Sequence, residues 1–130
     1  MNKIIKIQTK VIPLPQTSDY LIGSDLLANL HKINELINKN YSVFLVLSDK
    51  NIFNLYGKRV VSSLEKLGKR VIISLIDPGE KYKDLSVILK LVKPYFQHGF
   101  DKNAGFVALG GGVVTDLGGF IASILLRGID

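Results

Sequence analysis

Hydrophobic residues form two kinds of pattern along this chain. Three apolar runs are continuous: SVFLVLSD, RVIISLI and GFVAL, which cover residues 42–49, 70–76 and 105–109. Continuous runs of this length are typical of strands buried on both faces of a parallel sheet. We therefore predict three buried strands, and two further short strands near the amino end over residues 4–9 and 19–23.

Between and after these runs, apolar residues recur every three or four positions, the period of one helical face. Ser24 can cap a first helix, Gly68 can end a second, and Pro94 is expected to distort or end a third. A fourth helix is predicted from Val113 to Leu126. The expected inward positions of the first three are Leu26, Leu27, Leu30, Ile33 and Ile37; Val60, Val61, Leu64 and Leu67; and Leu85, Ile88, Leu89 and Val92.

Strands that alternate with helices predict an α/β fold. We expect a mostly parallel sheet with helices on both faces, a Rossmann-like nucleotide-binding domain. The 130 residues fit a single domain. Ligands of such folds bind beyond the carboxyl ends of the strands. That rule selects residues 48–49, residues 77–83 and the glycine run that begins at Gly110, which we expect to lie together at one edge of the sheet.

Composition narrows the class of protein. Hydrophobic residues make up 47% and charged residues 22%, as in globular proteins, and the absence of cysteine excludes disulfides and thiolate metal sites. The net charge of +6 comes from scattered basic residues, which favours a solvated surface or an anionic small molecule over nucleic acid. Lysines interrupt the first ten residues, which therefore lack the apolar region of a signal peptide. The apolar stretch 120–126 is too short to span a bilayer. We expect a cytoplasmic protein with no nucleic-acid or membrane partner.

The segment ALGGGVVTDLGGF, residues 108–120, places glycines between a strand and a helix. This order lets main-chain N–H groups and a helix dipole face a phosphate. The segment is not a P-loop, and Thr115 stands where Gly-x-Gly-x-x-Gly would have its last glycine. A tight turn with close helix packing is the alternative, and packing is favoured for Gly118 and Gly119. Asp116, interpreted as a first-turn residue, either complements the helix dipole or contacts a ligand.

Other polar residues leave similar alternatives open. Asp49 and Asn51 follow a strand, where a carboxylate can accept hydrogen bonds from ribose hydroxyls or can cap the next helix. DPGEKYKD, residues 77–84, is by itself consistent with a turn and a solvated helix start. His31 and His98 belong to separate predicted helices and are interpreted as incidental. The sequence contains no recognisable complete metal site, nucleophile–base pair or pair of catalytic carboxylates.

Taken in order, these segments resemble the amino-terminal domain of 3-dehydroquinate synthase over essentially the whole chain. The family pattern contains Gly-Glu-x-x-Lys, then Ala-Leu-Gly-Gly-Gly-Val-Val-Gly-Asp-x-x-Gly-Phe, then Arg-Gly. Thr115 replaces the usual glycine and Gly118 a usual alanine. The matching positions are Asp49, Asn51, Gly79, Glu80, Lys83, Ala108–Val114, Asp116, Gly119, Phe120, Arg127 and Gly128.

The resemblance implies roles for these residues toward NAD and a phosphorylated keto-acid sugar substrate. Asp49 and Asn51 would hold the adenosine side of NAD, and Arg127 would reach the substrate. The remaining cofactor contacts would be Glu80 and Lys83, Gly111, Gly112 and Val113 close to the pyrophosphate, and Asp116 nearby. Thr115 would either shift the turn slightly or add its hydroxyl to the pyrophosphate contact.

The resemblance also implies a lyase activity. The family converts 3-deoxy-D-arabino-heptulosonate 7-phosphate to 3-dehydroquinate and phosphate, in the shikimate pathway of aromatic amino acid biosynthesis. It uses bound NAD and a divalent metal, zinc or cobalt, whose ligands come from a helical second domain, and the complete enzyme is expected to be a homodimer. We interpret residues 1–130 as the NAD-binding amino-terminal domain, a fragment without the metal-binding domain and inactive by itself.

Other interpretations remain open. A related sugar-phosphate cyclase would share these motifs, and a stand-alone nucleotide-binding module would lack catalysis. Metal-dependent alcohol dehydrogenases also carry a glycine run followed by aspartate, but they fit GEKYK and the final RGI less well.

Overall fold

The computed structural model describes residues 20–79 and 84–130. The strand predicted over residues 4–9, and the candidate cofactor residues Glu80 and Lys83, lie outside the described residues. Residues 20–23 lie inside them and form no strand, so this part of the prediction is wrong.

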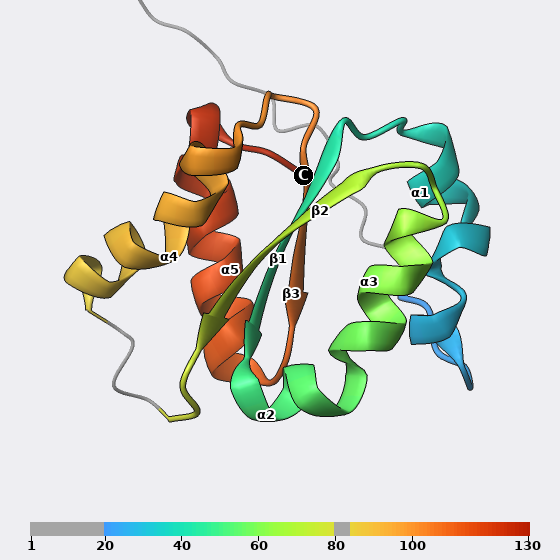
Figure 1. Cartoon of the computed structure of the whole chain (residues 1–130), viewed down its shortest axis with the longest axis horizontal. Helices are drawn as coiled ribbons and strands as arrows, with labels where there is room; N and C mark the ends of the chain where they lie inside the picture. Colours follow the sequence, from blue (N-terminus) through green and yellow to red (C-terminus); the bar gives the residue numbers. More distant parts are fainter. Residues whose placement is uncertain (1–19, 80–83) are drawn as a thin grey trace, which may run out of the picture.

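Three parallel strands form the centre of the molecule (Figure 1). They are β1 (Val43–Asp49), β2 (Arg70–Ile76) and β3 (Gly105–Leu109), in the order β2-β1-β3. β1 pairs Asp49 with Ile76 of β2, and Ser48 with Leu109 of β3. The carboxyl ends of all three strands therefore meet at one edge of the sheet, the lower edge in Figure 1, as the sequence predicted.

Helices cover both faces of the sheet. On one face lie α4 (Leu85–His98) and α5 (Gly112–Ile124), and on the other lies α3 (Lys58–Glu65) (Figure 1). A short α2 (Lys50–Ile52) and a π-helical turn, η3 (Phe53–Gly57), lead from β1 into α3, and a 3₁₀ turn, η5 (Leu125–Arg127), follows α5. The prediction of an α/β fold with helices on both faces is confirmed.

Alternate side chains of β1 enter two separate cores. Leu45 and Leu47 pack with Tyr95 of α4 and Ile121 of α5, whereas Val46 packs on the opposite face. The Tyr95 hydroxyl is buried and donates a hydrogen bond to the main-chain oxygen of Val46 at 3.0 Å. Burial raises the pKa of Tyr95 well above its usual value. The second core consists of Tyr41, Phe44, Val46, Val60 and Leu64.

The helix predicted after Ser24 is broken into η1 (Leu26–Ala28), η2 (Leu30–Lys32) and α1 (Asn34–Asn38). Leu27 and Leu30 of the predicted inward face pack against the second core, but Ile37 is 47% exposed and Leu36 packs there in its place, so this part of the prediction is wrong. None of these segments buries a residue fully. Ile33 has an extended backbone, with φ −78° and ψ 117°. Both the main-chain N–H of His31 and its ring hydrogen-bond to the Ser63 hydroxyl of α3. Contacts with α3, and not one continuous helical ladder, hold this segment.

α4 continues through Pro94 and ends at Gly99, which has φ 73°. Of the two expected effects of Pro94, distortion or termination of the helix, termination is therefore wrong. Leu91, Val92 and Tyr95 are buried on either side of the proline, so packing against the sheet holds the helix together there. The inward face also differs from the prediction, because Leu85 and Leu89 are 69% and 70% exposed.

Candidate functional site

The three strand ends enclose a small open pocket of about 200 Å³. We call it the edge pocket. It brings together Asp49 at the end of β1, Gly79 after β2, and Gly111 and Gly112 after β3. The complete lining is Asp49, Ile76, Pro78, Gly79, Gly111, Gly112, Val113 and Val114. The expected convergence of the strand ends is thus confirmed for Asp49 and the glycine run.

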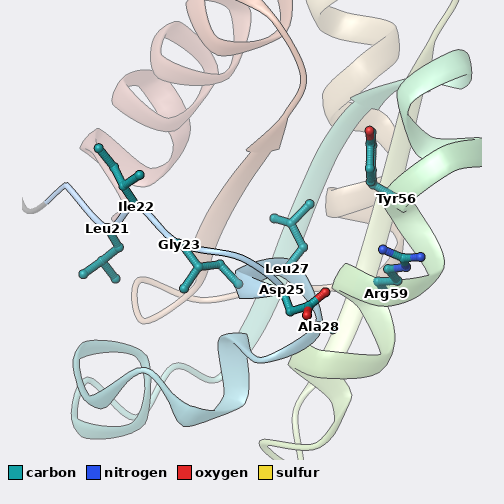
Figure 2. Close-up of a pocket in the computed structure, with 9 residues that line it drawn as sticks. Leu21, Ile22, Gly23, Asp25, Leu27, Ala28, Tyr56 and Arg59 are labelled. Atoms are coloured by element: carbon teal, nitrogen blue, oxygen red, sulfur yellow. The ribbon is translucent and has the colours of Figure 1, made fainter.

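A larger depression of about 440 Å³ lies elsewhere, between the segment around residues 21–28 and the helical region opposite (Figure 2). Asp25, Tyr56 and Arg59 are its polar residues, and the others that line it are apolar or glycine. Ile22 at its rim is 98% exposed. None of the residues predicted to bind cofactor or substrate lines this depression, so its greater volume does not make it the stronger candidate.

Different structural reasons account for the presence of glycine at the five glycine positions between residues 110 and 119. No described atom lies within 4 Å of a Cβ placed on Gly111 or Gly112, so their missing side chains leave open space beside the pocket. A Cβ on Gly110 would lie 2.7 Å from Val114, and one on Gly118 would lie 2.7 Å from the Cβ of Ala108. Close packing therefore explains Gly110 and Gly118. It does not explain Gly119, which is exposed and open, so that interpretation was wrong.

α5 points its amino end at the edge pocket. Its N-cap is Gly111, with φ −84° and ψ −166°, and no described side chain caps this helix by a hydrogen bond. Because the first N–H groups of a helix lack intrahelical partners, they and the helix dipole attract an anion. Val113 lies in this first turn and also lines the pocket.

Asp116 lies beyond the first turn, since α5 begins at Gly112. Its interpretation as a first-turn residue was therefore wrong. It lines a neighbouring apolar depression of about 380 Å³ between α4 and α5, together with Leu85, Phe120 and others, and not the edge pocket itself.

Asp49 is half-buried and caps α2, since its Oδ1 accepts a hydrogen bond from the N–H of Ile52 at 2.9 Å. The capping alternative is confirmed, and a carboxylate has acceptor capacity beyond one hydrogen bond. Asn51 is exposed on the same short helix and does not line the edge pocket. Lys50 and Asp77 form an ion pair at 2.5 Å that links the segments after β1 and β2.

Two hydroxyl groups at this edge hold the main chain, and sequence reasoning had assigned neither of them this contact. Ser48 is fully buried and donates to the main-chain oxygen of Leu109 at 2.7 Å, which ties β1 to β3. The Thr115 hydroxyl lies 3.1 Å from the oxygen of Gly112 and 3.3 Å from that of Gly111. A polar residue inside an otherwise apolar strand was the signal that could have identified Ser48.

The candidate substrate residue Arg127 does not line the edge pocket. Arg127 is exposed and follows α5, whose 13 residues make its two ends about 20 Å apart.

Burial and the charges of Lys66 and Lys32 lower the pKa of His31. Among the described residues, no group of three histidine, aspartate or glutamate side chains could hold a metal ion. No helix in the described part of the chain is long and apolar enough to cross a membrane.

The family model and the curated relatives both identify 3-dehydroquinate synthase as the family that this chain resembles. Residues 73–130 match the family model for the 3-dehydroquinate synthase N-terminal domain. The whole chain aligns with 3-dehydroquinate synthase from Crocosphaera subtropica at 34% identity, and 92% of it with that from Rippkaea orientalis at 38% identity. The chain spans 34% and 32% of those two relatives, about a third of their length.

Solved structures share the fold. 2-Deoxy-scyllo-inosose synthase matches with a TM-score of 0.69 and 26% identity, over 77% of this chain and 28% of that one. The 2-epi-5-epi-valiolone synthase ValA of Streptomyces hygroscopicus, whose structure contains NAD+ and Zn2+, matches with a TM-score of 0.68 and 27% identity. That match covers 92% of this chain and 33% of ValA.

Proposed function

Because the chain is related to the 3-dehydroquinate synthases through their N-terminal domain, we propose that its edge pocket binds NAD. One observation carries this proposal. The uncapped amino end of α5, the open space at Gly111 and Gly112, and the carboxylate of Asp49 all border the same pocket. A dinucleotide needs a site for an anionic pyrophosphate and an acceptor for ribose hydroxyls, and these features supply both.

The residues fit the cofactor in a specific way. The N–H groups of Gly112 and Val113 would donate to the pyrophosphate, and a side chain at Gly111 or Gly112 would fill the space beside it. Asp49 would accept hydrogen bonds from the adenosine ribose while it continues to cap α2. By family likeness, the further contacts are Asn51, Glu80, Lys83 and Asp116.

We further propose that the protein acts in the 3-dehydroquinate synthase reaction, as a lyase on 3-deoxy-D-arabino-heptulosonate 7-phosphate. NAD, when bound, supplies a transient oxidation that acidifies the neighbouring C–H and so makes loss of phosphate feasible. Arg127 would contact the phosphorylated substrate. The described residues do not fit a divalent metal, so we assign no metal-dependent step to them.

A second candidate activity is that of another sugar-phosphate cyclase. The matches to 2-deoxy-scyllo-inosose synthase and 2-epi-5-epi-valiolone synthase favour it, because this chain has their fold at 26% and 27% identity. Both candidates predict the same NAD site. Phosphate release by the whole protein from each phosphorylated sugar would distinguish them.

Calorimetric titration with NAD tests the binding proposal. Gly111→Val is expected to abolish measurable NAD binding, because the side chain projects into space where the protein itself has no described atom. The matched control is Gly119→Val, another exposed glycine with no described neighbour within 4 Å of a built Cβ, and Lys58→Ala is a remote control. Both controls are expected to bind NAD as the parent does. Equal NAD affinity for Gly111→Val and the parent would refute the proposal.

A further inference from the structure

Side-chain hydroxyl groups hold the main chain of the glycine run at both of its ends. At the start, the buried Ser48 hydroxyl donates to the oxygen of Leu109 at 2.7 Å. At the end, the Thr115 hydroxyl points at the oxygens of Gly111 and Gly112, at 3.3 and 3.1 Å. The main-chain N–H of Thr115 also donates to the Gly111 oxygen at 3.0 Å. Ser48 fixes the run where it leaves β3, and Thr115 fixes it where α5 begins.

The direction of a carbonyl determines the direction of the next N–H. Among residues 20–79 and 84–130 every peptide bond is trans, so the C=O and N–H of one peptide point in opposite directions. The oxygens of Gly111 and Gly112 point along α5 toward Thr115. The N–H groups of Gly112 and Val113 therefore point back toward the amino end of the helix, where the edge pocket lies.

Glycine pairs do not keep such an orientation by themselves. Glycine has the greatest main-chain freedom of any residue, and no described side chain caps α5 at Gly111. Because no neighbouring side chain surrounds Gly111 and Gly112, packing does not restrict these two residues either. The main-chain ladder of α5 holds the two peptides whose N–H groups face the pocket, and the Thr115 hydroxyl adds hydrogen bonds at 3.3 and 3.1 Å that limit their rotation further.

We propose that Thr115 is a positioning residue that orients these N–H groups for an anion before the ligand arrives. The proposal rests on the proposed NAD site and extends it to the one position where the glycine run has threonine in place of the usual family glycine. The hydroxyl hydrogen is directed at main-chain oxygens, so Thr115 acts through Gly111 and Gly112 and not by donating to the ligand.

Two substitutions separate the hydroxyl from the rest of the side chain. Thr115→Val keeps the shape of threonine and removes the hydroxyl, whereas Thr115→Ser keeps the hydroxyl. Thr115 is exposed, so neither change alters the core, and thermal unfolding checks that both variants fold. In the ligand-free protein, NMR relaxation of the amide groups of Gly112 and Val113 reports the order of the turn. Calorimetry with NAD reports affinity.

For Thr115→Val we expect lower order parameters at Gly112 and Val113, and NAD affinity reduced by about 3- to 10-fold, the effect of one ordinary hydrogen bond. Thr115→Ser is expected to restore both. Unchanged order in Thr115→Val overturns the proposal. If NAD affinity falls in Thr115→Val while the amide order stays unchanged, the proposal is also overturned, because the Thr115 side chain would then contact the ligand directly. A parent protein that does not bind NAD contradicts the proposed function, whereas the relaxation data still decide whether Thr115 holds the turn.

Discussion

At the scale of single residues, Asp49 combines a structural and a proposed binding role. Its carboxylate caps α2 through the N–H of Ile52 and also borders the edge pocket. The cap fixes the side chain where the proposed ribose hydroxyls would need an acceptor. The same contact that stabilises the helix start would therefore also hold the residue in place for the proposed ligand.

The two roles of Asp49 can be separated by substitution. Asparagine caps helices as well as aspartate, so Asp49→Asn is expected to leave the free energy of unfolding nearly unchanged, whereas Asp49→Ala should lower it by about 1 kcal/mol. Because hydrogen bonds to charged groups are the stronger ones, NAD affinity should fall by roughly tenfold or more in both variants. Urea unfolding and calorimetry measure the two effects. NAD affinity equal to the parent's in Asp49→Asn would exclude the carboxylate as a cofactor contact.

At the scale of elements, α5 is seated on β3 through a glycine. A Cβ at Gly118 would lie 2.7 Å from the Cβ of Ala108 and 3.2 Å from the Phe106 ring, so the helix lies closer to the strand than a larger residue at this position would allow without a shift. Gly119, one position further, faces open space. This close seating sets where the amino end of α5, and with it the edge pocket, lies relative to the sheet.

The matched pair Gly118→Ala and Gly119→Ala measures that seating. Both exchanges remove a glycine from the interior of α5, so the gain in helix propensity is the same and cancels in the comparison. Overpacking typically costs about 1–3 kcal/mol, and Gly118→Ala should be less stable than Gly119→Ala by that amount. Urea unfolding of the two variants gives the difference. Equal stabilities would mean that α5 can move away from β3 without cost.

Strands and helices differ in how far the sequence could predict them. The strand bounds followed from continuous apolar runs, since residues 70–76 and 105–109 are the observed β2 and β3. The break at Ile33 and the continuation of α4 through Pro94 depend on contacts with distant elements, such as His31 with Ser63, which local periodicity does not encode. In the site, the meeting of Asp49 with the glycine run was predictable from topology. The direction of the Thr115 hydroxyl was not, because it depends on the exact start of α5.

At the scale of the whole molecule, the sheet carries the proposed cofactor site at one edge and places the proposed substrate contact elsewhere. β1 is buried on both faces between two cores, which fixes the neighbouring strand ends around the edge pocket. Arg127 lies beyond the far end of α5, about 20 Å from the glycine run. The relatives from Crocosphaera and Rippkaea are about three times the length of this chain. The proposed cofactor contacts and the proposed substrate contact can therefore be altered separately.

A polypeptide of residues 1–130 is expected to bind NAD without releasing phosphate from 3-deoxy-D-arabino-heptulosonate 7-phosphate, even with zinc supplied. The main proposed NAD contacts lie at one edge of a sheet that both cores support. A catalytic zinc normally takes three protein ligands. In the described part of the chain, His31 contacts the Ser63 hydroxyl at 2.9 Å and His98 the Pro94 oxygen at 2.8 Å, and neither histidine lines the edge pocket.

Phosphate release with NAD and zinc, measured against a sample without protein, checks this expectation, and NAD calorimetry on the same preparation confirms that the domain is folded and competent. Arg127→Ala is the matched variant, because it alters the proposed substrate contact and leaves the edge pocket unchanged. NAD binding with no phosphate release is the expected result, because the proposed cofactor contacts share the edge pocket whereas the described residues offer no three-ligand zinc site. Turnover above the background rate that Arg127→Ala removes would instead show that these 130 residues are sufficient for catalysis.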